Sequence, residues 1–239
     1  MSTTVNTNNP YNLSIRFSSD GFYLYITDDK RKQISSNKVA CDCMNLSEDV
    51  LSDVLSNVPE FGLNYSSVDI TIESEQYTVI PAPLFSETHM SDYLKLQHSS
   101  IKDNTPILFN KLAIWNAVVI FSCPIAIEAV VRKILPEIEL THHLVDFANN
   151  SISLQNSSSV NVNVRKTLID VFVTKSGLLT LVNTYKYNSN EDFLYHIMNI
   201  YDQLSLDTEN CGITLHNLHN KNDLQELISK YIRNCKVQN

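Results

Sequence analysis

The chain has 239 residues, of which 43% are hydrophobic and 18% charged, and this balance excludes an intrinsically disordered protein. Its four glycines are never paired, which excludes Walker loops, G-x-G-x-x-G turns and G-x-S-x-G nucleophile elbows. The formal net charge of -8 opposes nucleic-acid binding, because neutralising a phosphate backbone requires an excess of Lys and Arg. Length and composition therefore predict a globular protein of one large domain or two lobes.

The N-terminal segment, residues 1–11, is polar and rich in Asn and Thr, so we expect a flexible tail without a signal peptide. Five cysteines are an odd number in a chain large enough to fold without disulfides, which favours reduced thiols. Both observations predict a cytoplasmic protein.

A meander of three strands is predicted directly after this tail. The expected strands are residues 13–17, 22–27 and 34–41. Ser47 is expected to cap a helix whose apolar stripe runs over residues 50–58. A further strand over residues 68–73 completes the unit.

The most apolar stretch, residues 112–131, has the length of a membrane span. It contains Pro124 and Glu128, and a carboxylate at the bilayer centre is costly. We therefore predict no membrane span. The stretch is interpreted as a buried strand over residues 115–121 and a helix over 127–134, a β-α unit of a packed α/β core.

The same order of elements recurs after the polar residues 149–159, which indicates an internal repeat. The expected second copy comprises strands over 160–164, 169–174 and 178–187, a helix over 190–204 and a strand over 213–216. Asn190 is predicted to begin its helix as Ser47 begins the first one. A final helix is expected over residues 224–232.

Three meandering strands, a helix and a returning strand, present twice, resemble the duplicated ribonuclease-H-like unit of the actin-like ATPase fold. The segments Leu13–Phe22, Tyr77–Phe85 and Asn183–Tyr195 are also similar to an uncharacterised Bacteroidetes family of short bacterial proteins with this fold. The resemblance covers nearly the whole chain. It implies an α/β protein with mixed sheets flanked by helices, and it implies no established activity.

We accordingly expect two ribonuclease-H-like lobes, over residues 12–155 and 156–239. The first lobe is expected to carry an inserted segment near residues 81–111. Neither the partner nor the oligomeric state follows from this organisation.

The resemblance also says where a nucleotide would bind. Actin-like ATPases hold phosphates with one D-x-G-x-x-[ST] hairpin per lobe and adenosine with a glycine pair, because glycine lets backbone N-H groups approach phosphate closely. The corresponding degenerate phosphate-loop positions are Ser18, Ser19, Asp20, Gly21, Arg165, Lys166 and Thr167. In the first loop the acid Asp20 is adjacent to the glycine and therefore out of register with the D-x-G pattern. The second loop has neither acid nor glycine. Residues 216–223 contain His, Asn, Leu, Lys and Asp in place of the glycine pair.

From these departures we predict no nucleotide cofactor, no catalytic residues and a non-catalytic scaffold. Degenerate relatives, such as pilus-assembly actin-like proteins, imply an unidentified protein partner. The alternative is an ATPase with an unconventional phosphate loop. A hydrolase would need a nucleophile beside a base, and the sequence identifies none.

The cysteine and histidine clusters of the sequence could be metal ligands or core residues. Cys41 and Cys43 are expected on one face of a strand, and the zinc-ligand candidates elsewhere are Cys211, His216 and His219. Because no C-x-x-C pair accompanies them, we expect core cysteines and no metal. His142 and His143 are expected to lie at a buried helix or strand end rather than to bind metal.

Three short segments follow the order of the motifs in serine penicillin-recognising enzymes. They are Ser35–Lys38, Ser91–Tyr93 and Lys175–Gly177. That chemistry places Ser and Lys on a buried helix, whereas an alternating strand is predicted here, so this interpretation is rejected.

Asp170 and the pair Arg165–Lys166 are expected to be solvent-facing charges on a half-exposed sheet. The alternative is a basic pair that receives an acidic peptide or anion in an interlobe cleft. The aromatic residues Tyr185, Tyr187, Phe193 and Tyr195 are interpreted as core, with a partner-binding edge as the alternative.

Overall fold

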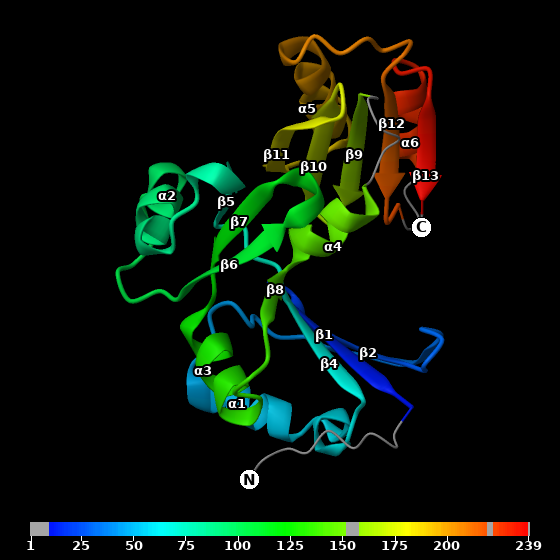
Figure 1. Cartoon of the computed structure of the whole chain (residues 1–239). Helices are drawn as coiled ribbons and strands as arrows, with labels where there is room; N and C mark the ends of the chain where they lie inside the picture. Colours follow the sequence, from blue (N-terminus) through cyan, green and yellow to red (C-terminus); the bar gives the residue numbers. More distant parts are fainter. Residues whose placement is uncertain (1–9, 152–157, 219–221, 239) are drawn as a thin grey trace. The chain divides into compact units, whose positions relative to one another are not determined.

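The computed structural model describes residues 10–151, 158–218 and 222–238 (Figure 1). The chain divides into two compact units, Met1–Val145 and Asp146–Asn239. Each unit is built around a mixed five-stranded sheet, and each is described by itself.

The sheet of the first unit has the strand order β3-β2-β1-β4-β8. Its strands are β1 (Asn12–Ser18), β2 (Gly21–Thr27), β3 (Gln33–Val39), β4 (Ser67–Ile72) and β8 (Leu140–His142). The first three strands pair in antiparallel fashion, whereas β4 runs parallel to both β1 and β8. The predicted meander and returning strand are therefore confirmed.

Two helices of the first unit supply apolar faces to its core. They are α1 (Glu48–Ser56) and α3 (Ile125–Ile134), which contact each other (Figure 1). Leu51 and Leu55 of α1 are buried, as are Leu13, Ile15 and Phe17 at alternate positions of β1. Each such side chain contributes about 1.5–3 kcal/mol when it is fully buried. Ser47 precedes α1, as predicted, but its side chain makes no capping hydrogen bond.

Between β4 and α3 the chain forms a separate antiparallel sheet of order β5-β7-β6. Its strands are β5 (Tyr77–Pro81), β6 (Ile107–Leu112) and β7 (Ala117–Ser122), with α2 (Met90–Gln97) packed on them. The short 3-10 turns of this unit are η1 (Pro59–Gly62), η2 (Ala82–Leu84), η3 (Glu87–His89) and η4 (Ala113–Trp115).

The apolar run at β7 corrects one prediction. Trp115 belongs to η4, so the strand begins two residues later than its predicted start, and it pairs antiparallel with β5 and β6. A fully apolar strand carries no information about which sheet it enters, because both of its faces are buried. The following helix is confirmed as α3. Among the described residues, no helix is long and apolar enough to cross a membrane.

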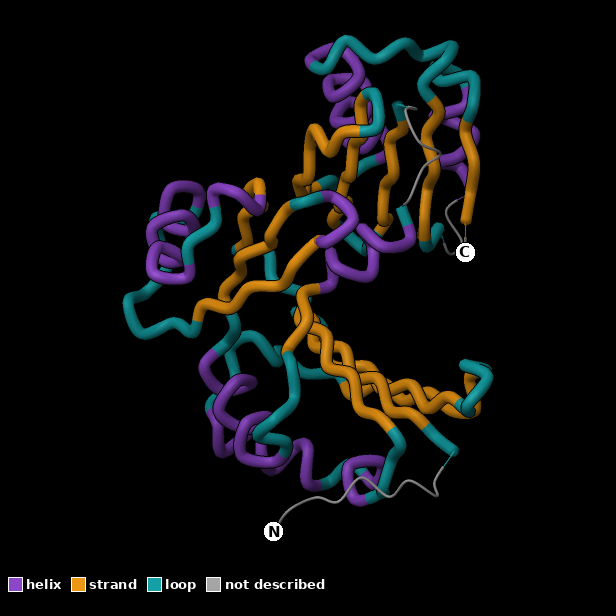
Figure 2. The backbone as a smooth tube through the Cα atoms, viewed as in Figure 1, coloured by secondary structure: helices purple, strands orange, loops and turns teal. Residues whose placement is uncertain are grey.

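The second unit repeats the first in strand order and direction. Its sheet has the order β11-β10-β9-β12-β13, with its strands side by side (Figure 2). The strands are β9 (Ser159–Val164), β10 (Leu168–Lys175), β11 (Leu178–Lys186), β12 (Gly212–His216) and β13 (Cys235–Gln238). Antiparallel β9, β10 and β11 are followed by parallel β12 and β13, so the predicted duplication is confirmed.

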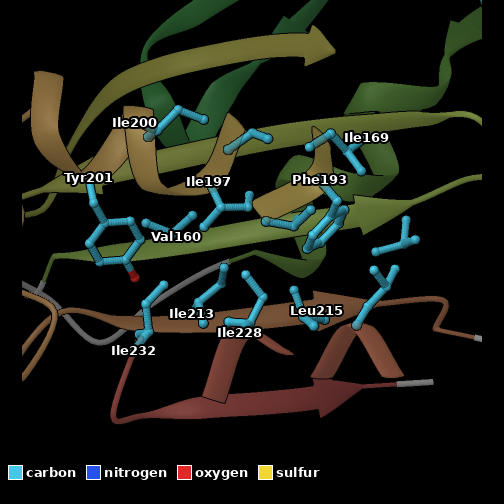
Figure 3. Packing of buried hydrophobic residues seen from close by; sticks show 14 of the residues in the cluster. Val160, Ile169, Phe193, Ile197, Ile200, Tyr201, Ile213, Leu215, Ile228 and Ile232 are labelled. Carbon is cyan, nitrogen blue, oxygen red and sulfur yellow. The ribbon is translucent and has the colours of Figure 1, made fainter. Parts of the chain in front are cut away.

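The core of the second unit lies between its sheet and two helices, α5 (Asn190–Gln203) and α6 (Asn222–Ser229). Figure 3 shows Phe193, Ile197 and Ile200 of α5 among the apolar side chains of β9 and β12. The N-cap of α5 is Ser189 and not Asn190, since the Ser189 hydroxyl accepts a hydrogen bond from the Asp192 backbone N-H at 3.1 Å.

The C-terminal prediction is wrong in its extent. Helix α6 ends at Ser229, three residues before the predicted end, and the unpredicted strand β13 follows it. Ile232 lies beyond the helix but is still buried, so the apolar spacing reflected burial rather than continued helix. Helix α4 (His143–Asn150) spans the sequence boundary between the two units.

Candidate functional site

The first hairpin contains the first predicted phosphate-loop positions. Ser18 pairs with Gly21 at the ends of β1 and β2, which leaves a two-residue turn of Ser19 and Asp20. Gly21 has φ +140°, and a Cβ added to it would lie 2.2 Å from the Val39 carbonyl oxygen. Glycine is therefore required here by the close approach of the C-terminal end of β3.

The Asp20 carboxylate is bound by side chains of its own unit. It accepts hydrogen bonds from the Ser18 hydroxyl at 2.7 Å and from the Tyr23 hydroxyl at 3.1 and 3.2 Å. The Lys38 ammonium donates to it at 2.8 Å and lies 4.7 Å from the centre of the Tyr23 ring.

These contacts shift the pKa values of both members of the ion pair, Asp20 and Lys38. The Lys38 hydrogen bond, followed by those from Ser18 and Tyr23, lowers the pKa of Asp20 to about 2. The same pair raises the pKa of Lys38. Asp20 is thus a carboxylate whose negative charge is compensated by an ammonium group from β3.

The second hairpin contains the other predicted positions, Arg165, Lys166 and Thr167, between β9 and β10. The Arg165 backbone N-H donates to the Leu168 carbonyl at 2.9 Å. Tyr187 binds the same turn twice, since its hydroxyl donates to the Arg165 carbonyl at 2.9 Å and its backbone N-H donates to the Thr167 carbonyl at 3.0 Å. The turn is therefore fixed by the residue that follows β11.

Asp170 on β10 is fully buried, so the prediction of a solvent-facing charge is wrong. Its carboxylate pairs with the Arg165 guanidinium at 2.7 Å. Asn163 donates a further hydrogen bond at 2.9 Å, and the Thr184 hydroxyl donates another at 2.8 Å. Asn163 and Thr184 are the register partners of Asp170 on β9 and β11, so all three side chains leave the sheet on one face.

The side chains of Asp170, Asn163 and Thr184 begin a polar face of the sheet, and this face continues onto β12. The Asn217 amide donates to the Asn163 side-chain oxygen at 2.7 Å, and His216 Nε2 lies 3.2 Å from the Asn161 side-chain oxygen. Phe147 packs its ring edge-on to His216, with ring centres 5.4 Å apart. Burial lowers the pKa of His216.

Residues 216–223, where the resemblance places an adenosine-binding glycine pair, are partly described. Asn217 adopts φ +58°, the left-handed conformation that glycine favours and that Asn tolerates best among other residues. The side chain of Asn217 is used within the polar face. Residues 219–221 lie outside the described residues.

The burial of this polar face was not predicted, because the alternate apolar positions of β10 account for one buried side only. Phe172 and Thr174 share the face of Asp170, and both are buried. Phe147 of α4 contacts Phe172, with ring centres 6.2 Å apart. The available signal was the short amides Asn161 and Asn163 on β9, where a solvent-facing strand would usually carry longer charged side chains.

The zinc candidates lie in separate elements. Cys41 and Cys43 follow β3 in a turn, and not in the strand predicted for them, because β3 ends at Val39. Cys211 is buried before β12, where its carbonyl accepts a hydrogen bond from the Tyr201 hydroxyl at 3.0 Å. His219 lies outside the described residues. Among those that are described, no group of three or more His, Cys, Asp or Glu is arranged to hold a metal ion.

His142 and His143 lie at the junction of β8 and α4, as predicted, with their ring centres 4.3 Å apart. Both side chains are buried, and a hydrogen bond joins His142 Nε2 to the Ser74 carbonyl at 2.9 Å. The pair is therefore built into the interior of the first unit.

The segments that follow the order of penicillin-recognising motifs are structural. Ser35 and Lys38 lie on β3, and Lys38 pairs with Asp20. Ser91 and Tyr93 lie on α2, and Tyr93 donates a hydrogen bond to a backbone carbonyl. Lys175 ends β10 and is followed by the turn of Ser176 and Gly177, and the Lys175 ammonium donates to the Leu204 carbonyl at 2.7 Å.

The aromatic cluster of the second unit separates into two groups. Tyr187 and Phe193 are buried, with ring centres 5.6 Å apart, as the core interpretation predicts. Tyr195 is 66% exposed and packs beside His196, which in turn stacks on Tyr185 with ring centres 4.9 Å apart. Tyr195 is thus a surface residue of α5, whereas Tyr185 on β11 is partly buried and packs against the core of the second unit, in agreement with the core interpretation.

Comparisons with known proteins agree with this architecture. A structure from Bacteroides thetaiotaomicron, described as a protein with actin-like ATPase fold and unknown function, is 26% identical with a TM-score of 0.81, over 96% of this chain and 91% of that one. The PilM-PilN type IV pilus biogenesis complex matches at 10% identity and TM-score 0.53, over 95% and 88% of the two chains. The chain thus has the actin-like ATPase fold with two ribonuclease-H-like lobes.

A third similar structure is the ethanolamine utilization protein EutJ from Carboxydothermus hydrogenoformans, at 9% identity and TM-score 0.48, over 98% and 86% of the chains. A family profile described as "Protein of unknown function (DUF3822)" matches residues 2–235. A search of curated proteins finds none that matches the sequence.

Proposed function

For this chain, which belongs to the DUF3822 family of proteins of unknown function, we propose a non-catalytic actin-like scaffold that binds another protein. The observation that carries this proposal is the pairing of the charged side chains at both hairpins. Asp20 is neutralised by Lys38, and Arg165 is neutralised by the buried Asp170.

This pairing opposes nucleotide binding at each hairpin. A phosphate loop needs backbone N-H groups that approach the phosphate and a carboxylate that positions hydrated Mg²⁺. In the first hairpin the carboxylate already accepts hydrogen bonds from an ammonium and two hydroxyls. In the second, the guanidinium that would attract a phosphate is held by a carboxylate that is fully removed from solvent.

Two observations support a protein partner. The PilM-PilN structure is a complex in which a protein of this fold is bound to another protein. In this chain Tyr195 is 66% exposed beside His196 and Tyr185, and Tyr is among the residues enriched at protein interfaces. We propose a cytoplasmic location for this interaction, because the odd number of cysteines in a chain of this length favours reduced thiols.

The alternative is an actin-like ATPase with an unconventional phosphate loop. It is favoured by the exposure of the Asp20 side chain, which is 47%, so a cation in solvent competes with Lys38 for this carboxylate. The two proposals differ in what Mg-ATP does to the folded chain.

Thermal unfolding with and without Mg-ATP separates them. A ligand that binds only the folded state stabilises it by RT ln(1 + [L]/Kd), so a nucleotide site gives a concentration-dependent rise in the unfolding midpoint. The scaffold proposal expects no rise for the native chain. A rise that disappears in Asp20→Ala, and persists in the control Asp103→Ala on another exposed acid, contradicts it.

A further inference from the structure

Two cysteines of the first unit lie in direct contact just after β3. The sulfur atoms of Cys41 and Cys43 are 2.7 Å apart, close enough for one thiol to hydrogen bond to the other. The residue between them anchors the turn, since the Asp42 carbonyl accepts from the Asn45 backbone N-H at 3.0 Å and its carboxylate accepts from the Asn45 amide at 2.9 Å. The turn therefore holds both thiols on the same side.

The two thiols differ in access to solvent. Cys41 is partly exposed, whereas Cys43 is fully buried. Burial, together with the contact to Cys41, raises the pKa of the Cys43 thiol. A small oxidant that arrives from solvent thus meets Cys41 first, and Cys43 lies directly behind it.

We propose that Cys41 and Cys43 are a thiol–disulfide exchange site that closes a reversible intramolecular disulfide with a small disulfide of the glutathione class. In the first step the Cys41 thiolate attacks one sulfur of oxidised glutathione, which forms a mixed disulfide and releases one glutathione thiolate that takes up the Cys41 proton. In the second step the Cys43 thiolate attacks the Cys41 sulfur, and the second glutathione leaves with the Cys43 proton. The two cysteines are oxidised by two electrons, and one glutathione disulfide is reduced to two thiols.

The geometry supports the second step in particular. A mixed disulfide on Cys41 places its sulfur beside the sulfur that must attack it, so resolution needs no rearrangement between distant elements. The resulting ring spans one intervening residue and lies at a partly exposed turn, and exposed disulfides of this kind are readily reduced again. The site is independent of the proposed scaffold function, since none of its atoms belongs to either hairpin turn.

The site also adjoins the first hairpin. A Cβ on Gly21 would meet the Val39 carbonyl at 2.2 Å and the Ala40 Cα at 3.2 Å, so the backbone that leads into Cys41 packs on this glycine. Lys38, three residues before Cys41, holds Asp20. The disulfide would therefore form directly after the backbone that packs on the first hairpin, although its own atoms belong to neither hairpin turn.

The test uses the purified full chain in glutathione buffers of increasing oxidised fraction, followed by acid quenching, alkylation and peptide mass spectrometry. The expected result is the loss of two alkylated thiols and a peptide in which Cys41 is linked to Cys43, reversed by dithiothreitol. The Cys43→Ser variant is expected to stop at one glutathionyl group on Cys41. In Cys41→Ser, the buried Cys43 is expected to stay unmodified while the chain is folded.

Cys235→Ser is the matched control, because Cys235 is also partly exposed but lies on β13 of the second unit, and this variant is expected to keep the Cys41–Cys43 disulfide. The proposal is overturned if native Cys41 retains glutathione without closing the disulfide, if Cys43 links to another cysteine, or if both thiols remain fully alkylated. The native-chain measurement needs no variant, so it decides the question even if Cys43→Ser fails to fold.

Discussion

The two units place an ion pair at the same point of the repeat, beside the hairpin between the first two strands, but they bury it to different extents. In the first unit the Asp20 and Lys38 side chains are 47% and 44% exposed. In the second unit Asp170 is 0% exposed and Arg165 is 13% exposed. An exposed pair gains little because water and salt compete for both charges, whereas each member of a buried pair depends on the other. The first hairpin can therefore lose its pair with little cost, and the second cannot.

The largest effect is expected for Arg165→Ala. Removing the guanidinium takes a charged partner away from the fully buried Asp170 carboxylate, which lowers the free energy of unfolding by about 3–5 kcal/mol even though Asn163 and Thr184 still donate to it. Equilibrium urea denaturation measures this loss. The control Lys166→Ala removes an exposed cation from the same turn and is expected to change stability little. Equal losses in the two variants would show that the turn's charge, and not the buried pair, stabilises the fold.

The next effect is expected for Gly21→Ala in the first hairpin. The new Cβ would lie 2.2 Å from the Val39 carbonyl oxygen, and φ +140° is strained for any residue with a side chain. A loss of about 1–3 kcal/mol in the free energy of unfolding is expected. Gly212→Ala is the control, because its Cβ would meet the Asn234 carbonyl at 3.2 Å, so a smaller loss is expected. A loss at Gly212 as large as that at Gly21 contradicts the close-approach explanation.

The architecture was predictable because its signals are local. Apolar and polar residues alternate in residues 13–17 and 22–27, and the same alternation recurs after residue 159. This pattern predicts the strands, and the duplication of one unit predicts their order in each sheet. The sheet that the strand at residues 117–122 enters was not predicted, since the partner of a fully apolar strand is set by distant segments.

The site was less predictable for the same reason. The apolar residues Ile169, Val171 and Val173 correctly indicate one buried face of β10. Burial of the opposite face depends on contacts such as that between Phe147 and Phe172, which are far apart in sequence. The pairing of Asp20 with Lys38 was missed because it joins the turn before β2 to strand β3, and no single segment specifies the register between β2 and β3.

A pH dependence is expected from the polar face of the second unit. Burial lowers the pKa of His216 below its ordinary 6.5, so protons bind more readily to the unfolded chain. The stabilising contribution of neutral His216 is therefore complete above pH 6.5 and declines as the pH falls through the lower folded-state pKa. Urea denaturation between pH 5 and 8 is expected to show this slope, reduced in His216→Gln and retained in His89→Gln, an exposed control. An unchanged slope in His216→Gln assigns the effect to other groups.

The smallest effect on stability is expected for Lys38→Met, because the pair that it breaks is exposed to solvent on both sides. The titration of Asp20 should nevertheless change clearly. Its pKa of about 2 depends first on the Lys38 hydrogen bond, so in the variant it is expected to rise toward the ordinary 3.8. In the native chain the contribution of this pair is present above pH 3.8 and is lost as the pH falls toward 2.

Carboxyl chemical shifts of Asp20, followed by NMR through an acid titration, measure this change directly. A pKa that stays near 2 in Lys38→Met would assign the shift to Ser18 and Tyr23 and not to Lys38. Because the pKa shift and the stabilisation by the pair are linked, the rise is expected to come with a small loss of stability above pH 3.8. The first unit would then fold without the Lys38 ammonium that pairs with Asp20. The second unit would not tolerate the loss of Arg165 in the same way, because its partner Asp170 is buried.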